Sequence, residues 1–424
     1  MKILFKNARI LTMVDENIID GHLVVTDNRI SYIGKQLPTG IFDQVIDCEE
    51  NLIMPGFKNA HTHSAMTFLR SKADDQSLQD WLFKEIFPRE ANLHEGCIKE
   101  LSKVAILEYL TSGTTSAFDM YFFPQEFADT CNEMGFRSVS IAMYDKDIRP
   151  VEECLRLFRD NNKVNSLATF VIGMHSEYTP TDEMFKATKA LLDQTGSKFY
   201  THLSETEREV KECYERRGCS PMEYFNSLGF FDNGGAIYHG VYLSDNDINI
   251  IKEKDVTVVS NPSSNMKLAS GIADIKKLLD NGVRVALGTD GPASNNALDM
   301  FREMYLVTGL QKIKYMDPVS IPAFEVLKMA TVNGAYAMGL NDADTLQVGK
   351  LADLIMIDLS RPSMQPINNI ISNLVYSGSK DCVKLTMING KILYRDGNFF
   401  VGEDVKDIYK KVQLLTEELN VIKD

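Results

Sequence analysis

The sequence predicts an α/β fold: a (β/α)8 TIM-type barrel with a small β-sandwich domain that is built from both chain termini. Two observations predict it. Apolar β-branched runs alternate with helical stretches through the middle of the chain, and short strand-like runs occur at both of its ends. We therefore expect the amino-terminal part of the sandwich over residues 1–54 and the barrel over 55–345. The carboxyl-terminal part, with a terminal helix, is expected over 346–424.

The barrel is predicted from eight apolar runs that each end in polar residues and precede a helical stretch. A doubly wound open sheet is the alternative, but the chain lacks the glycine-rich dinucleotide loop that supports it. The eight runs are Asn51–His63, Thr114–Tyr121, Ser138–Tyr144, Thr169–His175, Lys198–His202, Ala236–Leu243, Thr257–Asn261 and Val283–Asp290.

The smaller domain is predicted from short runs rich in Ile and Val, with turn signals such as Asn389-Gly390 between them. Residues 404–420 carry apolar side chains at helical spacing and predict a closing amphipathic helix. The runs are Lys2–Phe5, His22–Thr26 and Arg29–Ile33 near one end, and Asp353–Ile357, Val383–Ile388 and Lys391–Tyr394 near the other.

Composition narrows the class of partner. The 59 acidic residues outnumber the 45 basic ones, for a net charge of −14, and such a surface repels phosphate backbones and anionic lipid. We therefore expect a small-molecule substrate, no nucleic acid and no membrane. The seven cysteines are scattered without a C-x-x-C pair, and the first residues lack the apolar core of a signal peptide. Both features indicate a reducing, cytoplasmic compartment.

Histidines gather where the chemistry of such a barrel belongs, at the carboxyl ends of its strands. Five of the seven histidines end predicted strands, and Asp290 ends the eighth. His61 and His63 lie two residues apart on one strand, so their imidazoles project to the same side and can hold one ion. Singly, His202 reads equally well as a core histidine and Asp290 as a turn residue. Together the set predicts one divalent metal ion, with Zn²⁺ preferred and Fe²⁺ or Mn²⁺ as alternatives.

A hydrolytic metal site also needs groups that move protons. Glu205 lies three residues after His202, and His239 ends the sixth run, so both can face a metal-bound water. Asp290 can accept the proton of that water before attack. We predict Glu205, His239 and Asp290 as catalytic residues; a solvated loop acid is the alternative for Glu205.

Four motifs resemble the amidohydrolase superfamily, specifically its cytosine-deaminase and chlorohydrolase-like branch. They are Met54–His63, His202–Glu205, Ser260–Leu268 and Gly288–Asn296. The resemblance covers almost the whole chain. It is strongest to the deaminases of 5′-methylthioadenosine and S-adenosylhomocysteine, through Thr67–Arg70, Trp81-Leu82, Pro88–Glu90 and His175–Thr179.

This resemblance implies a mononuclear site with His61, His63, His202 and Asp290 as ligands. It implies hydrolytic deamination of an adenosine-type nucleoside, in which Glu205 protonates a ring nitrogen while His239 and Asp290 handle the water. His175 would bind the purine and Glu90 the ribose hydroxyls. Arg149, Trp81 and Ser294 are further candidates for substrate contacts, although Trp81 also fits helix packing. Relatives with this architecture form dimers or larger assemblies, which makes a homo-oligomer an option here.

The same metal chemistry suits other substrates, and we keep these as the alternative: guanine, a pterin, cytosine or a chlorinated triazine. A non-catalytic scaffold is disfavoured because every ligand is present. Relatives that accept S-adenosylhomocysteine place arginines after the third strand, where this chain has only Arg149. Glu177 stands where relatives often carry proline and is expected to add negative charge at the pocket rim. We therefore predict weak turnover of S-adenosylhomocysteine relative to 5′-methylthioadenosine or adenosine.

Overall fold

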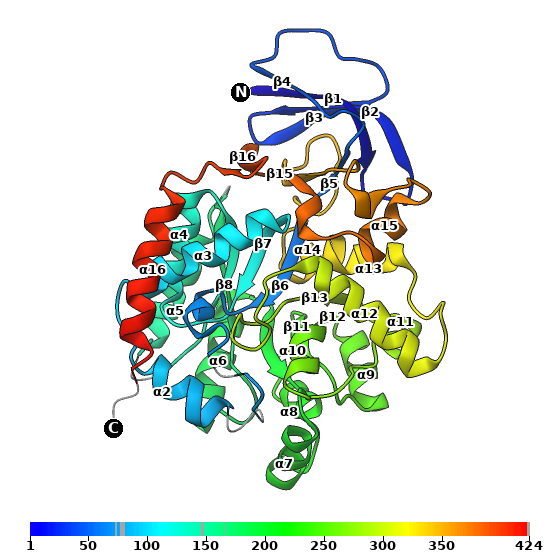
Figure 1. The fold of residues 1–424 in the computed structure, drawn as a ribbon. Coiled ribbons are helices and arrows are strands. Elements are labelled where there is room, and N and C mark those ends of the chain that lie inside the picture. Colours follow the sequence, from blue (N-terminus) through cyan, green and yellow to red (C-terminus); the bar gives the residue numbers. More distant parts are fainter. Residues whose placement is uncertain (73, 77–80, 146–147, 165, 422–424) are drawn as a thin grey trace.

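The computed structural model describes the chain except for residues 73, 77–80, 146–147, 165 and 422–424. Within the described residues, two β-sheets organise the molecule: an eight-stranded parallel sheet surrounded by helices, and a nine-stranded sheet made from both ends of the chain. The nine-stranded sheet lies at one end of the molecule, with the helix-covered barrel below it (Figure 1). The predicted fold class is thereby confirmed.

The eight parallel strands follow one another around the barrel in sequence order. Every predicted run overlaps one of them, with bounds that differ by a few residues. The seam between the last and the first strand is closed by side-chain and loop contacts, including a hydrogen bond from the Asp290 amide to the His61 carbonyl oxygen at 3.0 Å. The strands are β6 (Phe57–Thr62), β7 (Thr114–Asp119), β8 (Arg137–Ala142), β9 (Ala168–Gly173), β10 (Phe199–Leu203), β11 (Gly235–His239), β12 (Val256–Ser260) and β13 (Val285–Leu287).

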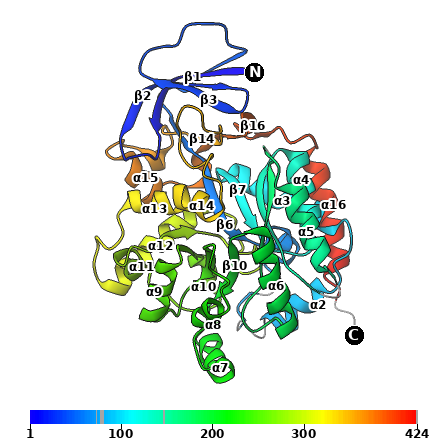
Figure 2. The ribbon, with the colours of Figure 1, turned by 180° about the vertical axis from the view of Figure 1, so that it is seen from behind.

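Helices cover the outside of this barrel, as the rear view also shows (Figure 2). Several begin at side-chain caps; Ser220 and Ser244, for example, each start a helix with a capping box. The helices that follow barrel strands are α3 (Cys97–Thr111), α4 (Pro124–Met134), α5 (Val151–Asn161), α6 (Asp182–Thr195), α7 (Glu207–Arg217), α8 (Pro221–Ser227), α9 (Asp245–Glu253), α10 (Pro262–Lys267), α11 (Ile275–Asp280), α12 (Met300–Tyr315), α13 (Ala323–Ala330) and α14 (Val332–Ala337).

Short helical turns follow β6 and lead toward the barrel rim: η1 (Ser64–Leu69), the π-helical turn η2 (Trp81–Ile86) and α2 (Phe87–Glu90). The predicted closing helix is present as α16 (Val405–Leu419), which Asp404 caps and which packs along α3 (Figure 1). Further helices near the terminal sheet are η3 (Pro362–Met364), α15 (Ile370–Tyr376) and η4 (Lys380–Cys382).

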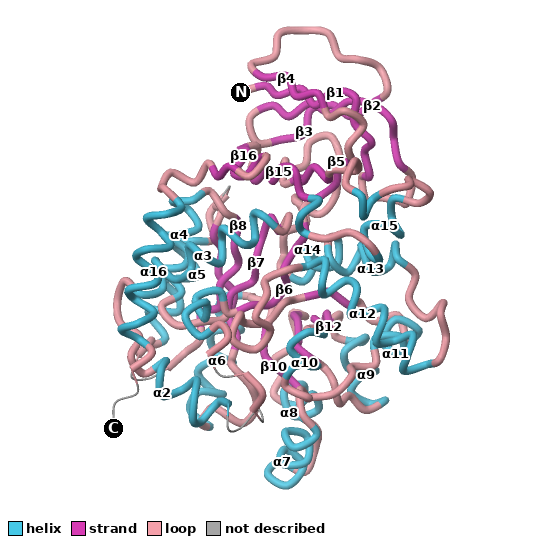
Figure 3. Tube along the Cα trace, in the orientation of Figure 1, coloured by secondary structure: helices cyan, strands magenta, loops and turns pink. Residues whose placement is uncertain are grey.

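The terminal strands all belong to one hydrogen-bonded sheet, in the order β17-β16-β15-β14-β5-β1-β2-β3, with β4 added beside β1. Strand β5 joins the two halves, because it pairs in parallel with β1 and antiparallel with β14. Figure 3 shows these strands gathered above the barrel. They are β1 (Lys2–Leu11), β2 (Ile18–Thr26), β3 (Arg29–Gly34), β4 (Gln44–Asp47), β5 (Leu52–Pro55), β14 (Leu354–Ile357), β15 (Val383–Ile388), β16 (Lys391–Arg395) and β17 (Asn398–Phe399).

The sheet and the barrel meet at Gly56, which divides the first predicted run into β5 and β6. A β-carbon there would lie 2.1 Å from Thr115 Cγ2, so the chain can turn from sheet to barrel only with glycine. Beside it, Arg137 on β8 forms a buried two-pronged ion pair with Asp353, at 2.5 and 3.1 Å, just before β14. No helix within the described ranges is long and apolar enough to cross a bilayer.

Candidate active site

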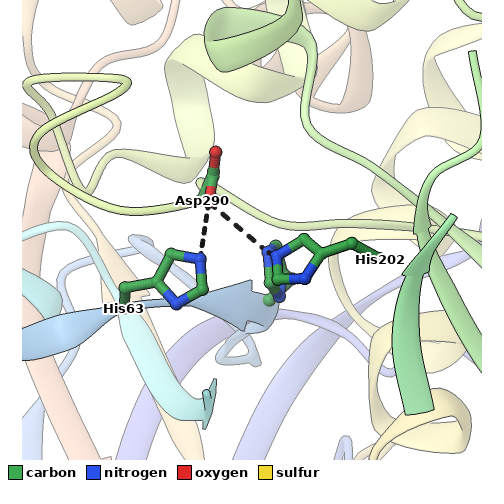
Figure 4. A group of neighbouring side chains, drawn as sticks. His63, His202 and Asp290 are labelled. Carbon is green, nitrogen blue, oxygen red and sulfur yellow. Dashed lines mark hydrogen bonds and ion pairs between the residues drawn. The ribbon is translucent and has the colours of Figure 1, made fainter. Parts of the chain in front are cut away.

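Four side chains converge at the end of the barrel away from the terminal sheet. They are His61, His63, His202 and Asp290, and each offers a ligand atom within 4.8 Å of the other three. Asp290 Oδ1 lies 3.1 Å from His63 Nε2 and 3.4 Å from His61 Nε2, and His61 Nε2 lies 3.1 Å from His202 Nε2. Figure 4 shows Asp290 above His63 and His202, with the rings directed toward one another.

The local backbone explains why these atoms meet. His61 lies within β6 and His63 immediately after it, so the strand projects both rings to one side. Asp290 lies just beyond β13 in a left-handed backbone conformation, with φ of 59°. This strained conformation, uncommon for a residue with a side chain, turns the carboxylate back over the strand ends.

Three of the four ligands, His63, His202 and Asp290, also form hydrogen bonds on the side away from the cluster, whereas the buried Nδ1 of His61 has no partner among the described residues. His63 Nδ1 lies 2.5 Å from the Met120 carbonyl oxygen and His202 Nδ1 lies 2.7 Å from that of His175, which leaves both Nε2 atoms facing the centre. The second oxygen of Asp290 accepts hydrogen bonds from two hydroxyls. The donors are Ser264 Oγ at 2.6 Å and Ser294 Oγ at 2.7 Å.

The histidine ligands differ in charge state. Burial lowers the pKa of His63 less than its hydrogen bond to Asp290 and the charge of Asp290 raise it, so that pKa rises to about 9 and a metal ion would displace a proton there. Burial lowers the pKa of His61 to about 3 and that of His202 well below its ordinary value, so both imidazoles are neutral at pH 7. Neutral imidazole is the form that coordinates a cation. Three imidazole nitrogens and one carboxylate oxygen form a donor set that fits a first-row divalent ion.

Two further polar residues stand beside this cluster. Glu205 Oε2 lies 3.9 Å from His239 Nε2, and Glu205 Oε1 accepts a hydrogen bond from Ser270 Oγ at 3.1 Å. His239 ends β11 with φ of 71°, and its Nδ1 lies 2.7 Å from Asn265 Oδ1. The Glu205 carboxylate and His239 Nε2 therefore face each other at the edge of the metal-ligand cluster.

Glu205, His239 and all of the metal-ligand side chains except the fully buried His61 line a cavity and form its floor, and the walls of the cavity are largely apolar. Such a shape suits a ligand with a flat, mostly apolar body and a few polar anchor points. Among the described residues, no lysine or arginine lines it. The lining residues are His63, Met66, Trp81, Leu82, Ile86, Phe87, Glu90, Met120, Tyr121, Phe122, Met143, His175, Tyr178, His202, Glu205, His239, Leu268, Asp290 and Ser294.

Glu90 lies on the wall of this cavity. Tyr121 donates a hydrogen bond to Glu90 Oε1 at 2.6 Å, and no ion pair joins Glu90 to a cation among the described residues. Burial raises the pKa of Glu90, while the Tyr121 hydrogen bond acts in the opposite direction. Its second oxygen is available to accept hydrogen bonds from a ligand. His175 lies on another part of the wall, with its ring 4.7 Å from that of His202.

The three other residues predicted to contact substrate, Trp81, Ser294 and Arg149, lie in different surroundings. Trp81, the first residue of η2, packs into a hydrophobic core cluster and also lines the cavity. Ser294 also lines the cavity, but its hydroxyl is committed to Asp290. Arg149 does not line the cavity. Its guanidinium donates a hydrogen bond to the carbonyl oxygen of Met143, which does line the cavity, at 3.1 Å.

The expectation for Glu177 was wrong. Its side chain is buried rather than at the cavity rim, and it pairs with Arg216 at 2.5 Å and Arg217 at 3.3 Å, at the end of α7. The two guanidinium groups neutralise its charge. Glu177 therefore anchors the loop that carries His175 and adds no negative potential to the cavity.

Several residues that hold the site were not predicted. Ser264, Asn265 and Ser270 lie in or just after α10, and Tyr121 follows β7. The run Ser260–Leu268 was recognised as a motif, and that was the available signal for the first two, but no role could be given to its members. Tyr121 and Ser270 carry no distinguishing pattern in the sequence.

Comparison with known proteins agrees with this geometry. The chain is 42% identical over 400 residues to a 5-methylthioadenosine/S-adenosylhomocysteine deaminase of Thermococcus sibiricus, covering 93% of this chain and 94% of that protein. It is 40% identical over 391 residues to a 5'-deoxyadenosine deaminase of Methanothermobacter thermautotrophicus, covering 91% of each. The solved structure of an adenosine deaminase from Xanthomonas campestris with bound zinc superposes with a TM-score of 0.92 at 29% identity, over 98% of each chain. The model of the amidohydrolase family matches residues 52–393, and this chain therefore belongs to that family.

Proposed function

We propose that this protein hydrolytically deaminates an adenosine-type nucleoside: water adds to the amino-bearing ring carbon, the exocyclic C–N bond breaks, and ammonia leaves. The observation that carries the proposal is the placement of Glu205 and His239 beside the four metal-ligand side chains on the floor of an apolar cavity. The deaminase names of the relatives support the same reaction class.

Substrate binding is assigned to the cavity walls. Apolar side chains such as Trp81 and Met143 would hold the flat base, and His175 would contact its edge. We assign the ribose hydroxyls to Glu90, because its carboxylate has an acceptor oxygen that Tyr121 does not use. Binding at both ends would place the amino-bearing carbon over the floor, where proximity to the catalytic groups supplies part of the rate enhancement.

His61, His63, His202 and Asp290 would hold the metal ion, which when bound supplies a water of lowered pKa as the nucleophile. We propose zinc, from the three-nitrogen, one-oxygen donor set and from the zinc in the Xanthomonas campestris structure.

Proton transfers are assigned to the residues that face one another at the floor. Glu205 would deliver a proton to a ring nitrogen, which makes the neighbouring carbon electrophilic. Because Asn265 accepts from His239 Nδ1, His239 Nε2 would carry a lone pair and could take a proton from water. His239 would then return this proton to the amino group, so that the group leaves as ammonia. General acid–base assistance of this kind contributes about 10²- to 10⁴-fold.

The decisive experiment is an ammonia-release assay with adenosine, 5′-methylthioadenosine, S-adenosylhomocysteine, guanine and cytosine. We expect turnover of the nucleosides and none of the free bases. The variant E205Q should lose turnover while it keeps its metal content. The matched control is E207Q, two residues away on the exposed side of the same turn.

Ammonia from guanine or cytosine alone would overturn the proposal in favour of another heterocycle. Metal-loaded protein that turns over none of the five compounds would also overturn it.

We also propose a cytoplasmic location, which the seven free cysteines support because an oxidising compartment would favour disulfides. A homo-oligomer stays a prediction, and sedimentation of the purified protein would test it.

A further inference from the structure

Glu209 is a buried carboxylate that the proposed reaction does not use. It lies in the first turn of α7, is 7% exposed and does not line the cavity. Its two oxygens accept hydrogen bonds from consecutive main-chain amides: Oε1 from Ser204 at 2.7 Å and Oε2 from Glu205 at 2.8 Å. Among the described residues no lysine, arginine or histidine forms an ion pair with it. A buried carboxylate without a cation is costly, so these two hydrogen bonds are its main compensation.

The two amides belong to a sharp turn. Ser204 has φ of 55°, a left-handed conformation that an ordinary residue adopts only at a cost of about 1–3 kcal/mol. This turn follows the metal ligand His202 and directs the Glu205 side chain back toward the cavity. Without Glu209, the N–H groups of Ser204 and Glu205 would lose their hydrogen-bond partner.

The other side of the same peptide is tied to the loop after β11. The Ser204 carbonyl oxygen accepts hydrogen bonds from the amides of Val241 and Tyr242, each at 3.0 Å, and the Gly240 amide donates to the Leu203 carbonyl oxygen at 3.1 Å. Gly240 directly follows His239. One turn, clamped by Glu209, therefore sets the position of Glu205 relative to the loop that carries His239.

Helix capping alone does not explain this arrangement. In the capping box of α8, Glu223 returns its carboxylate to the amide of its own N-cap residue, Ser220, at 2.8 Å. In α7, Thr206 still caps the amide of Glu209, but the Glu209 carboxylate reaches past it to the two preceding residues. The carboxylate of Glu209 therefore binds the amides of the turn that carries Glu205 and not the amide of the N-cap residue of its own helix.

We propose that Glu209 is a positioning residue, which fixes the backbone of Ser204 and Glu205 so that the Glu205 carboxylate stays within reach of the bound base and of His239. The inference rests on the proposed function, because it assumes that Glu205 transfers the proton. Its effect should fall on the chemical step, since Glu209 does not itself line the cavity and forms no hydrogen bond with a metal ligand.

The test compares E209Q and E209A with E223Q, the matched change of a capping glutamate on α8. E209Q keeps one acceptor oxygen and E209A keeps none, so kcat should be lower in E209Q than in wild type and lowest in E209A. In E209A the decrease should be about 100-fold if the carboxylate of Glu205 moves by about 1 Å. KM for 5′-methylthioadenosine and the metal content should stay within about twofold of wild type. E223Q should keep the wild-type kcat even if its melting temperature falls as much as that of E209Q.

Two results would overturn the inference. The first is a wild-type kcat in E209Q and E209A. The second is a loss of activity that follows the loss of metal or of folded protein, because a purely structural role would lower the active fraction and leave the kcat of that fraction unchanged. If E209A does not fold, E209Q carries the comparison with E223Q.

E205Q, measured in parallel, separates this failure from that of the proposed function. An inactive E205Q with a fully active E209A overturns the positioning role alone. An active E205Q removes the proposed role of Glu205, and the inference falls with it.

Discussion

His239 and Asn265 form a buried pair in which the amide oxygen of Asn265 lies 2.7 Å from His239 Nδ1. The amide oxygen can only accept, so the pair fixes the proton of His239 on Nδ1 and leaves Nε2 as the acceptor toward the cavity. Asn265 therefore determines which nitrogen of His239 can take part in proton transfer.

Replacement of Asn265 tests whether this residue fixes the tautomer of His239. In N265A, His239 can rotate and adopt either tautomer, and we expect kcat to fall by about 10- to 100-fold, as for other lost partners of catalytic histidines. Steady-state kinetics with 5′-methylthioadenosine and metal analysis would measure the effect. N265D keeps an acceptor oxygen and should retain more activity than N265A; equal activity of all three proteins would contradict the assignment.

The charge of the cavity predicts substrate preference. Its described lining contains Glu90, Glu205 and Asp290 but no lysine or arginine, so no such side chain there would pair with the carboxylate of S-adenosylhomocysteine. We expect a lower kcat/KM for that compound than for 5′-methylthioadenosine or adenosine. Although the expected effect of Glu177 was wrong, the prediction stands on the lining residues alone.

An arginine introduced into the cavity lining should raise the relative kcat/KM for S-adenosylhomocysteine. In M143R a guanidinium replaces an apolar lining side chain, and one charged hydrogen bond contributes about 1.5–3 kcal/mol, or about tenfold or more in relative kcat/KM. M143Q is the matched neutral control. Unchanged ratios in M143R, or comparable kcat/KM for all three nucleosides in the wild type, would show that the tail lies elsewhere.

Removal of the metal should abolish activity and lower stability together. Four converging ligands bind a cation only in the folded state, so at 1,000 times Kd the ion adds about 4 kcal/mol to the free energy of unfolding. Dialysis against a chelator, followed by zinc titration with parallel melting curves and assays, would measure both. Activity that persists after the metal content reaches zero would contradict this site.

Glu303 on α12 predicts a pH dependence of stability. It is fully buried and accepts hydrogen bonds from the Ser263 amide at 3.0 Å and from Asn295 Nδ2 at 2.8 Å. Burial raises its pKa from 4.5 to about 7, against these hydrogen bonds. Between pH 4.5 and pH 7 the folded protein keeps a proton on Glu303 that the unfolded chain has released. The contribution of this proton to the stability of the folded state is therefore fully present below pH 4.5, and it is lost as the pH rises through 7.

The comparison with E303Q isolates this contribution. Between pH 4.5 and pH 8, the free energy of unfolding of the wild type should fall by up to about 3 kcal/mol relative to that of E303Q. This value follows from 1.36 kcal/mol per unit of pKa shift. Urea unfolding of both proteins across this range measures it. E95Q, a change of an exposed glutamate, should show no such difference from wild type; parallel curves for wild type and E303Q would refute the prediction.

The sequence was sufficient for the features that follow from local pattern. Alternating runs predicted all eight barrel strands, and the position of His61, His63, His202 and Asp290 at strand ends was enough to expect that they meet. In a parallel barrel the carboxyl ends of all strands lie on one rim, so residues that end different strands are brought close together in space.

The remaining features depend on contacts between loops, which periodicity does not encode. Ser270 reaches Glu205 across 65 residues of sequence, and Glu177 meets Arg216 and Arg217 only because α7 folds back over the loop after β9. Sequence pattern places Glu177 beside the pocket, but the pairing of its charge depends on a helix about 40 residues away, which local pattern does not reveal.

The passage of the chain from β5 through Gly56 into β6 has a consequence for the order of synthesis. Strand β5 needs β14 as its antiparallel neighbour, and residue 354 leaves the ribosome some 300 residues after residue 52. For all that time the nascent amino-terminal strands expose an unpaired edge, which is a site of aggregation until it is covered. The exposed edge of the amino-terminal strands therefore has to be kept from aggregating while the barrel is translated. The sheet is completed only when the carboxyl-terminal strands β14 to β17 have been made.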